Sequence, residues 1–157
     1  MLKEERTFVA IKPDGVERGL VGEIITRFER KGFKILALKL LQVSDAQAAS
    51  HYAEHKGKPF YNRLVKYITS GPIVAMVVKG FNAVESVRHI VGATNPLNAD
   101  VGTIRADYAQ VMEYNVIHAS DGLDSAEREI AIYFNESEMV DNWKNKTEEI
   151  IENEESL

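Results

Sequence analysis

The sequence predicts an α+β fold in which helices cover one side of a four-stranded sheet. The first observation behind this prediction is the order of the elements, which is strand-helix-strand, two short helices, and then strand-helix-strand-helix. The second is the length of 157 residues, which corresponds to one domain. The third is an apolar content of 45%, enough for a packed core, without any apolar stretch near the roughly 20 residues that a membrane span needs.

The composition excludes several classes of protein. There are no cysteines, so disulfide scaffolds, thiolate zinc sites and cysteine nucleophiles are excluded. The first six residues contain no apolar segment, and we therefore expect no signal peptide. The 19 basic and 24 acidic residues give a net charge of −5, and we expect neither nucleic acid nor a membrane as the main partner.

The acidity is concentrated at the C-terminus. Residues 144–157 contain five glutamates and two lysines, whereas the chain up to Trp143 carries a charge of only about −2. We therefore divide the chain into a main domain, residues 1–143, and an acidic extension, residues 144–157, which we expect to be a surface helix or a frayed tail. A nearly neutral main domain is compatible with a local basic pocket for a small anion.

The first third of the chain contains two predicted strands with a helix between them. Residues 6–12 are apolar on both faces, and the turn sequence Lys-Pro-Asp-Gly at 12–15 ends them. Gly32 stands where a C-cap glycine is expected, and residues 34–43 are the second strand. The helix between the strands has apolar residues at spacings of three and four: Val21, Ile24, Ile25 and Phe28.

Two short helices precede the most apolar strand. Ser44 and Gln47 have the spacing of a capping box, which predicts the start of a helix. The chain breaks at residues 57–59, and residues 72–79 form the third predicted strand. Between the break and this strand, helical spacing continues through Phe60, Leu64 and Ile68.

The next helix is expected to lead into a functional segment. Asn82 and Glu85 have capping-box spacing, and the buried stripe of this helix is expected at Val84, Val87 and Val91. Residues 93–114 then lack clean periodicity and exceed the length of an ordinary connection. A long irregular segment in a compact domain is usually functional, so we expect a functional role here.

A short strand and a helix complete the predicted domain. Residues 115–118 are short and apolar, which predicts the fourth strand. Asp124 and Glu127 have capping-box spacing and predict a helix that ends near Phe134. The tail after this helix has only a weak helical pattern.

Basic side chains are the candidates for binding phosphate. The chain contains neither a Gly-x-x-x-x-Gly-Lys-Ser/Thr loop nor a Gly-x-Gly-x-x-Gly turn after a strand. If the protein binds nucleotide phosphates, it must use discrete cationic side chains, and Lys12, Arg88 and Arg105 lie near turns or loops. The alternative for each of them is an ordinary surface charge, which is the usual situation of a single Lys or Arg.

The four histidines are the other candidates for chemistry. His51 and His55 are four residues apart and could bind a metal from one helix face. No third ligand is evident, however, and we interpret both as solvent-exposed side chains. His89 is also interpreted as a surface residue. His118 differs, because it ends a short apolar strand and small and polar residues follow it.

His118 could act as a base or a nucleophile. A histidine at a strand end is held by the sheet and still faces a cleft. Glu129 on the following helix could fold back and accept a hydrogen bond from one ring nitrogen, which would fix the tautomer and leave the other nitrogen free. The alternative is a strand-end histidine whose hydrogen bonds are simply satisfied.

The segment around His118 resembles the active-site signature of nucleoside diphosphate kinases, and the resemblance extends over residues 5–135. Several independent motifs fall in the order and spacing of that family, whereas any one of them alone would only be suggestive. They are NVIHASDGL at 115–123, TFVAIKPDGV at 7–16, RGLVGEI at 18–24, HY at 51–52, KPFY at 58–61, SGP at 70–72, GATNP at 92–96 and GTIR at 102–105.

The resemblance implies a ferredoxin-like sandwich with a four-stranded antiparallel sheet, covering helices, a helical hairpin and a long subunit-contacting loop. It implies that residues 1–143 are a catalytic domain. The implied reaction passes the γ-phosphoryl group of a nucleoside triphosphate, typically ATP, to a histidine and then to a nucleoside diphosphate. Both ribose and deoxyribose nucleotides and every base would be accepted.

The resemblance also implies a role for each matching residue. His118 would be the nucleophile and form a phosphohistidine in a ping-pong cycle, Glu129 would hold its ring, and Ser120 would lie nearby. The base would stack on Phe60, with Met112 covering its other face. Phosphate and sugar contacts are implied for Lys12, Tyr52, Arg88, Thr94, Arg105 and Asn115.

The implied cofactor is Mg²⁺, which would arrive on the nucleotide phosphates and not in a protein cage, with Asp121 near its water shell. The implied partners are nucleoside tri- and diphosphates and further copies of the chain. The retained loop with Pro96 favours a hexamer over a tetramer. A cytoplasmic location is expected.

Four positions depart from the common pattern of the family. Ala106 and Ala119 stand where glycine is frequent, and Glu113 and Tyr114 stand where a small residue and an arginine are common. Glu113 could crowd or repel a nucleotide, so the preferred base is left open. Two other functions also remain open at this point: a nucleotide-binding oligomer without turnover, and a phosphohistidine relay to protein targets.

Overall fold

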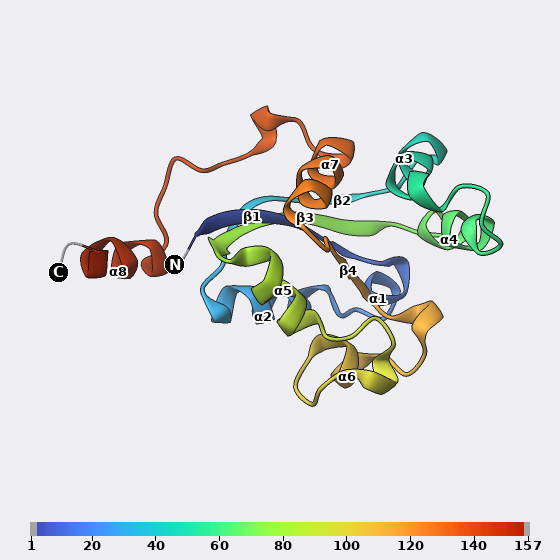
Figure 1. Cartoon of the computed structure of the whole chain (residues 1–157), viewed down its shortest axis with the longest axis horizontal. Coiled ribbons are helices and arrows are strands. Elements are labelled where there is room, and N and C mark those ends of the chain that lie inside the picture. The colour runs from blue at the N-terminus through green and yellow to red at the C-terminus, as the bar shows by residue number, and fades with distance from the viewer. Residues whose placement is uncertain (1–2, 156–157) are drawn as a thin grey trace.

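The computed structural model describes residues 3–155, and its centre is a four-stranded antiparallel sheet in the order β2-β3-β1-β4 (Figure 1). The predicted α+β class is confirmed. The strands of this described part are β1 (Glu4–Ile11), β2 (Lys34–Leu41), β3 (Ile73–Phe81) and β4 (Ile117–Ala119). Residues 1–2 of the expected main domain and 156–157 of the expected extension lie outside the described residues.

β1 and β3 form the centre of the sheet because both are apolar on their two faces. They pair along the whole of β1, from Glu4 opposite Phe81 to Ile11 opposite Val74. Residues 7–11 and 73–78 are buried without interruption. Strands of this kind must be covered on both sides to keep their apolar side chains from water.

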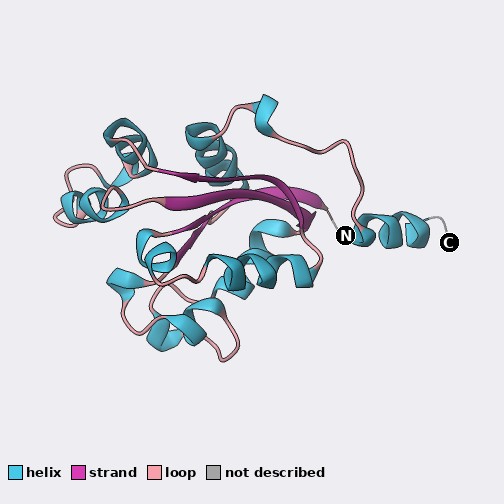
Figure 2. Ribbon diagram, turned by 180° about the vertical axis from the view of Figure 1, so that it is seen from behind, coloured by secondary structure: helices cyan, strands magenta, loops and turns pink. Residues whose placement is uncertain are grey.

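Helices cover both faces of the sheet, so the expectation of helices on one side only is wrong (Figure 2). The side chains of β1 alternate, which directs Val9 and Ile11 to one face and Phe8 and Ala10 to the other. The first face is covered by α2 (Val21–Lys31), α5 (Ala83–Val91) and α6 (Ile104–Tyr108), and the second by α3 (Asp45–His51), α4 (Tyr61–Ile68) and α7 (Leu123–Tyr133).

Short helical turns fill most of the connections. α1 (Pro13–Glu17) follows β1 directly, with Pro13 at its first position, where a proline is tolerated. The described 3-10 turns are Ala53–His55, Pro96–Asn98, Met112–Tyr114 and Glu136–Glu138.

Two of the predicted helix ends are confirmed. At the start of α3, the Ser44 hydroxyl accepts the N–H of Gln47 at 3.1 Å, and the Gln47 side chain accepts the N–H of Ser44 at 3.0 Å. Gly32 ends α2 with a φ of 100°, a left-handed conformation that costs glycine little.

The predicted capping box of α5 is wrong. Asn82 precedes α5 with a φ of 47°, and among the described residues its side chain accepts no hydrogen bond from the helix. Glu5 of β1 accepts the N–H of Val84 at 3.3 Å instead. Ala83 is buried beside Val87 and Val91, whereas Val84, which was expected in the buried stripe, is only partly buried.

The predicted cap of α7 is wrong as well. Gly122, two residues before Asp124, stands at the N-cap, and no side chain of the described residues caps this end. Glu127 binds Arg6 of β1 at 2.7 Å instead of closing a capping box. In both helices an ionic or polar contact with β1 replaces the local contact that the spacing predicts.

β4 is shifted along the chain relative to its prediction. Val116 was expected inside the strand but has a φ of 74°, and the strand runs from Ile117 to Ala119. The turn is held because the carbonyl of Val116 accepts the N–H of Lys12 at 2.8 Å, and the Asp14 carboxylate accepts the N–H of Val116 at 3.1 Å. The other three strands end within two residues of their predicted ends.

The segment 93–114 contains regular structure that its sequence does not reveal. It holds α6, which has five residues and is therefore too short to show a helical period, and two of the 3-10 turns. Thr103 caps α6 by accepting the N–H of Ala106 at 3.2 Å. This helix brings Arg105 into the interior of the protein.

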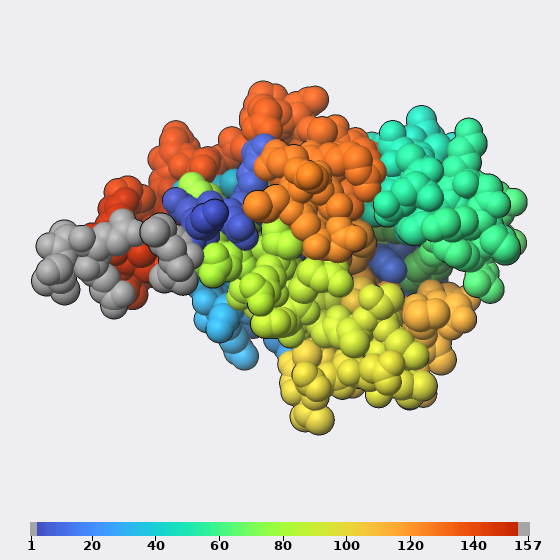
Figure 3. All heavy atoms as spheres, in the orientation of Figure 1, coloured from blue at the N-terminus to red at the C-terminus, as the bar shows by residue number. Residues whose placement is uncertain are grey.

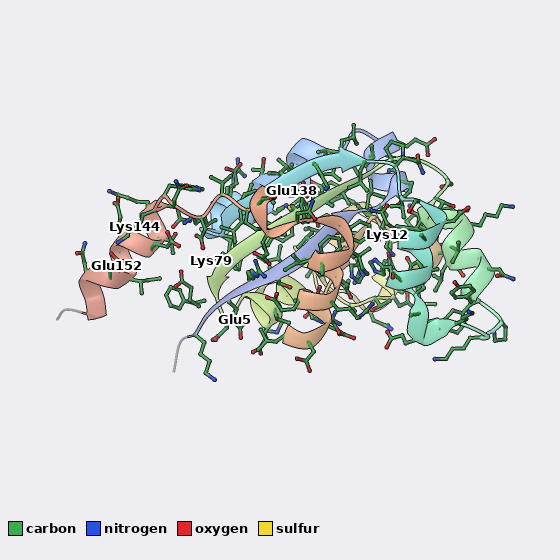
Figure 4. All side chains as sticks on the ribbon, turned by 90° about the horizontal axis from the view of Figure 1, so that it is seen from above. Glu5, Lys12, Lys79, Glu138, Lys144 and Glu152 are labelled. Atoms are coloured by element: carbon green, nitrogen blue, oxygen red, sulfur yellow. The ribbon has the colours of Figure 1, made fainter. Side chains whose placement is uncertain are left out.

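Most of the acidic extension forms a helix, which is one of the two alternatives expected for it, and the segment that leads into it contacts the edge strand β2. α8 (Lys146–Glu155) projects from the body, and its Glu152, with Lys144 just before the helix, lies at the opposite end of the sheet from Lys12 (Figure 4). The Lys34 ammonium, 2% exposed, binds Asp141 at 2.7 Å and Glu148 at 3.3 Å, which ties this segment to β2. No helix within residues 3–155 is long and apolar enough to cross a membrane.

We expect Gly92→Ala to lower the free energy of unfolding by about 1–3 kcal/mol. Gly92 has a φ of 93°, and an added Cβ would lie 2.5 Å from the Thr103 hydroxyl oxygen. Urea denaturation at one fixed protein concentration measures the change. The matched control is Gly22→Ala in α2, where no described atom lies within 4 Å of the added Cβ. It should leave stability unchanged or raise it by up to about 1 kcal/mol, and equal losses in both variants would contradict the prediction.

Candidate active site

Most of the predicted site residues meet in one pocket at the end of the sheet where β1 leads into α1. Figure 3 shows a hollow between the orange atoms of α7, the green atoms of the α3–α4 region and the yellow atoms of the segment 93–114. The pocket has a volume of about 230 Å³. Of the predicted residues, it is lined by Lys12, Tyr52, Arg88, Thr94, Arg105, Asn115, His118, Asp121 and Glu129.

His118 occupies the middle of β4, opposite Ala10 of β1, and its side chain is 26% exposed. Its Nε2 lies 2.6 Å from Oε1 of Glu129, so the hydrogen bond expected from the sequence is present. An ionised carboxylate can only accept a hydrogen bond, and Nε2 therefore carries the ring proton. The lone pair of the neutral ring is then on Nδ1.

Glu129 is a buried carboxylate on α7 that both predicted neighbours contact. The Ser120 hydroxyl donates to the same Oε1 at 2.8 Å, and Ser120 is itself fully buried. Burial opposes ionisation of Glu129, but the hydrogen bonds donated by His118 and Ser120, with the electrostatic attraction of the His118 ring, outweigh it and hold the pKa of Glu129 below its usual value. The carboxylate therefore stays charged and keeps the ring of His118 in one orientation.

His51 is part of this pocket, which corrects its interpretation as a solvent-exposed residue. It is 6% exposed, and its ring packs edge-on against the ring of His118 with centroids 4.7 Å apart. Its Nδ1 lies 2.8 Å from the Tyr133 hydroxyl. Burial, together with the nearby His118, lowers the pKa of His51 to about 3, so the ring is neutral at physiological pH.

The other two histidines differ from each other. His89 is exposed, as predicted. His55 is only partly exposed, and its ring packs edge-on against Phe60. The interpretation of His51 and His55 as solvent-exposed assumed that both lie on one side of a single helix. α3 ends at His51, however, and His55 lies in the 3-10 turn that follows. The sequence signal for the burial of His51 was its spacing of three residues from Ala48, which places both side chains on the same face of α3.

Lys12 and Asn115 meet although 103 residues separate them. The Lys12 ammonium donates to Oδ1 of Asn115 at 2.8 Å, and the Asn115 amide donates to the carbonyl of Thr94 at 3.0 Å. Burial and the charge of Arg105 lower the pKa of Lys12 to about 8, against the opposing effect of Asp14. The two cations therefore repel each other.

Arg105 is 6% exposed and is held by backbone carbonyl groups. Its guanidinium donates to Ile117 at 2.6 Å, to Gly92 at 2.9 Å and to Asn115 at 3.4 Å. A guanidinium has five N–H groups, so two remain for a ligand. Burial and the charge of Arg88 lower the pKa of Arg105 to about 10. Arg88 itself donates to the carbonyl of Ala119 at 3.3 Å.

A second pocket adjoins the first and is mostly apolar. Its volume is about 370 Å³, and it shares Lys12, Thr94 and Asn115 with the first pocket. Phe60 and Met112, the two residues expected to enclose a base, both line it and are 37% and 51% exposed. A flat apolar group could therefore enter here while an anionic group attached to it reaches the cations of the first pocket.

The departures from the family pattern lie in different places. Glu113 lines the second pocket, whereas Tyr114 packs edge-on against Tyr67 with ring centroids 5.5 Å apart. Ala119 is buried in β4, and Ala106 lies half-buried on α6. Of these positions, Glu113 is therefore the one that a ligand in the second pocket would meet.

Several residues that support the site were given no role in the sequence analysis. Tyr133 holds His51, and the Tyr67 hydroxyl donates to Asp14. Asp14 belongs to the motif at 7–16, but its contact with the turn before β4 was not expected. Arg128 also lines the first pocket, and its Nη2 lies 3.5 Å from Oε2 of Glu129. These residues act through contacts between distant parts of the chain, which spacing along the sequence does not reveal.

We expect the affinity of the protein for inorganic pyrophosphate to fall as the pH rises through about 8. Lys12 is charged only below its pKa, so its attraction for the anion is lost above it. Isothermal titration calorimetry across the range from about pH 7 to pH 9 measures the affinity.

Lys12→Arg is the matched control for the change in charge of pyrophosphate itself, because a guanidinium stays protonated over this range. The affinity of the wild type should fall relative to that of the variant as the pH rises. Parallel profiles of the two proteins would contradict the prediction.

Comparison with known proteins identifies the family to which this arrangement belongs. A sequence model of the family described as "Nucleoside diphosphate kinase" matches residues 5–139. A nucleoside diphosphate kinase of Archaeoglobus fulgidus is 58% identical over 147 residues, which cover 94% of this chain and 97% of that protein. One from Thermus thermophilus is 59% identical over 136 residues, 87% of this chain and 99% of that protein.

Solved structures agree with the sequence relatives. A halophilic nucleoside diphosphate kinase from Halobacterium salinarum, in complex with CDP, has a TM-score of 0.90 and 47% identity, covering 95% of this chain and 99% of that one. The nucleoside diphosphate kinase of Aquifex aeolicus has a TM-score of 0.85 and 39% identity, with coverage of 88% and 100%. These matches also confirm the ferredoxin-like sandwich. The chain therefore belongs to the nucleoside diphosphate kinase family of phosphotransferases.

Proposed function

We propose that the chain transfers the γ-phosphoryl group of a nucleoside triphosphate, typically ATP, to a nucleoside diphosphate through a phosphohistidine on His118. The observation that carries the proposal is the 2.6 Å contact between Nε2 of His118 and the buried Glu129, inside a pocket that also contains Lys12 and Arg105. A ring held by its Nε2 proton presents the lone pair of Nδ1 to the pocket. A pure nucleotide-binding protein has no need of such an oriented ring.

The chemistry proceeds in two in-line displacements. In the first, Nδ1 attacks the γ-phosphorus, the bond from phosphorus to the β,γ-bridging oxygen breaks, and a nucleoside diphosphate leaves. In the second, a terminal β-phosphate oxygen of another diphosphate attacks the phosphohistidine, and the P–N bond breaks. Glu129 stabilises the positive charge on the ring while the P–N bond exists, because its carboxylate remains ionised.

The cations of the pocket neutralise phosphate charge in both steps. Lys12 and Arg105 are held in advance by Asn115 and by backbone carbonyls, so little reorganisation is needed when the substrate binds. Arg88, Thr94 and Tyr52 line the same pocket and would add contacts to phosphate or sugar oxygens. Phosphoryl transfer depends mainly on such alignment and charge neutralisation.

Base recognition is proposed to be loose. Phe60 offers a ring face and Met112 an apolar side chain in the second pocket, and stacking accepts any base. The halobacterial relative was solved with CDP, which supports a diphosphate site of this kind. Glu113 lines the same pocket and could crowd or repel a nucleotide, so the preferred base stays open.

Mg²⁺ is proposed to enter with the nucleotide as part of the substrate. Mg²⁺ prefers oxygen ligands alone, whereas the buried carboxylate of the pocket, Glu129, is grouped with the ring nitrogens of His51 and His118 and therefore does not form a cage for it. Asp121 is exposed at the rim and could contact the water shell of the ion. The ion would screen the charge of the phosphates.

The chain is further proposed to form a homohexamer, in preference to a tetramer, through the segment 93–114. Pro96 is buried at the start of a 3-10 turn, whereas Leu97 is 81% and Val101 100% exposed. Exposed apolar side chains on one segment favour contact with another subunit. The cytoplasmic location and the division into residues 1–143 and 144–157 stay predictions.

Incubation with γ-labelled ATP and Mg²⁺ tests the reaction. We expect an acid-labile, base-stable label on the protein, which transfers to added GDP. His118→Gln should lose both the label and the transfer, whereas His89→Gln, at an exposed histidine outside the pocket, should keep both. Label that transfers only to proteins would favour the relay, and no label in the wild type would refute the proposal.

Arg105→Ala should slow transfer by about two orders of magnitude or more, because the variant loses guanidinium contacts to the charged transition state. It should also lower the stability, since the carbonyls of Gly92 and Ile117 lose their buried donor. Single-turnover kinetics by rapid quench, at a temperature where circular dichroism shows the variant folded, separates the two effects. Arg30→Ala on α2 is the control, and an unchanged rate in Arg105→Ala would remove Arg105 from the site.

A further inference from the structure

We propose that the pocket also binds a divalent transition-metal ion of the zinc class between His51, His118 and Glu129. Binding of this ion and phosphorylation of His118 would exclude each other, so the metal would act as a reversible inhibitor. The binding itself stands on the geometry of the three side chains, whereas its inhibitory effect rests on the proposed function.

The three side chains already form a compact group of potential ligands. One ligand atom from each of them lies within 4.8 Å of the other two. The rings of His51 and His118 stand at 70° to each other, and Nε2 of His118 is 2.6 Å from the Glu129 carboxylate. Zinc ligands lie at about 2.0–2.2 Å from the ion, so small rotations about side-chain bonds would bring all three atoms into range.

The hydrogen bonds behind these ligands have the arrangement that metal sites use. Nδ1 of His51 lies 2.8 Å from the Tyr133 hydroxyl, so Nε2 of this ring is the nitrogen left for a ligand. Ser120 donates to Glu129 at 2.8 Å and fixes the carboxylate from the other side. Metal-binding histidines usually hold their second nitrogen in such a contact, which sets the tautomer and the ring orientation.

The donor set selects the class of ion. Two imidazole nitrogens and one carboxylate oxygen suit Zn²⁺ or Co²⁺, whereas Mg²⁺ prefers oxygen ligands alone. This site therefore differs from the proposed entry of Mg²⁺ on the nucleotide. The three ligands line the pocket of about 230 Å³, where water could complete the coordination.

The bound ion would remove the nucleophile. Coordination at Nε2 of His118 replaces the proton that this atom shares with Glu129, and a neutral imidazole must then carry its proton on Nδ1. The lone pair that attacks phosphorus is thereby lost. Coordination at Nδ1 would block the same lone pair directly. Conversely, a ring that is phosphorylated on Nδ1 and keeps the Nε2 proton that it donates to Glu129 has no lone pair left for the ion.

Titration of the nucleotide-free protein with CoCl₂, without Mg²⁺, tests the binding. We expect one equivalent of Co²⁺ with visible absorption bands of nitrogen and oxygen coordination, and X-ray absorption that reports two imidazoles. His51→Gln should weaken binding at least tenfold, and Tyr133→Phe about tenfold. His89→Gln, at an exposed histidine outside the pocket, should bind as the wild type does. Unchanged affinity in His51→Gln, or fewer than two imidazoles on the ion in the wild type, would overturn the proposal.

Stability and phosphorylation are controlled separately. Circular dichroism establishes whether each variant is folded. If His51→Gln is unfolded, the number of imidazoles that X-ray absorption reports on the ion in the wild type decides whether the metal site exists. Protein treated with ATP and Mg²⁺ and then freed of nucleotide should lose the cobalt site, and a retained site on phosphorylated protein would refute mutual exclusion. Absence of phosphohistidine would count against the proposed function, while the titration of untreated protein still decides the metal site.

Discussion

The hydrogen bond between His118 and Glu129 is the contact on which the site depends. A carboxylate that is 4% exposed is stable in the charged form only if donors surround it, and His118 and Ser120 supply them. The same bond sets the tautomer of His118. One buried charge therefore determines which ring nitrogen faces the pocket, and it links α7 to β4 across the sheet edge.

The two buried cations of the pocket are also held in place by hydrogen bonds. Lys12 and Arg105 are partly or fully withdrawn from water and close to each other, and burial lowers the pKa of both. Asn115 and the backbone carbonyls hold them in place despite this repulsion. An anion that enters the pocket reduces the repulsion between the two cations. Because the fold holds these cations in place beforehand, little binding energy is spent on positioning them.

Prediction from the sequence succeeded where the physical signal is local. The capping box at Ser44, the left-handed Gly32 and the three long strands follow from neighbouring residues and agree with the structure. It failed at Asn82 and Asp124, where side chains of β1 compete with the local caps. His51 was misplaced for a comparable reason, since its burial results from Tyr133 and His118, which are far away in the chain.

The sequence by itself determined the family, the order of the main elements and the identity of most groups gathered in the pocket, because motifs and periodicities are properties of neighbouring residues. Only the tertiary structure decided that helices cover both faces of the sheet and that Asn115 meets Lys12 over a separation of 103 residues. It also decided that His51 stands beside His118. Contacts of this kind arise when β4 pairs with β1 and α7 folds back over the sheet, and no local pattern encodes their distances.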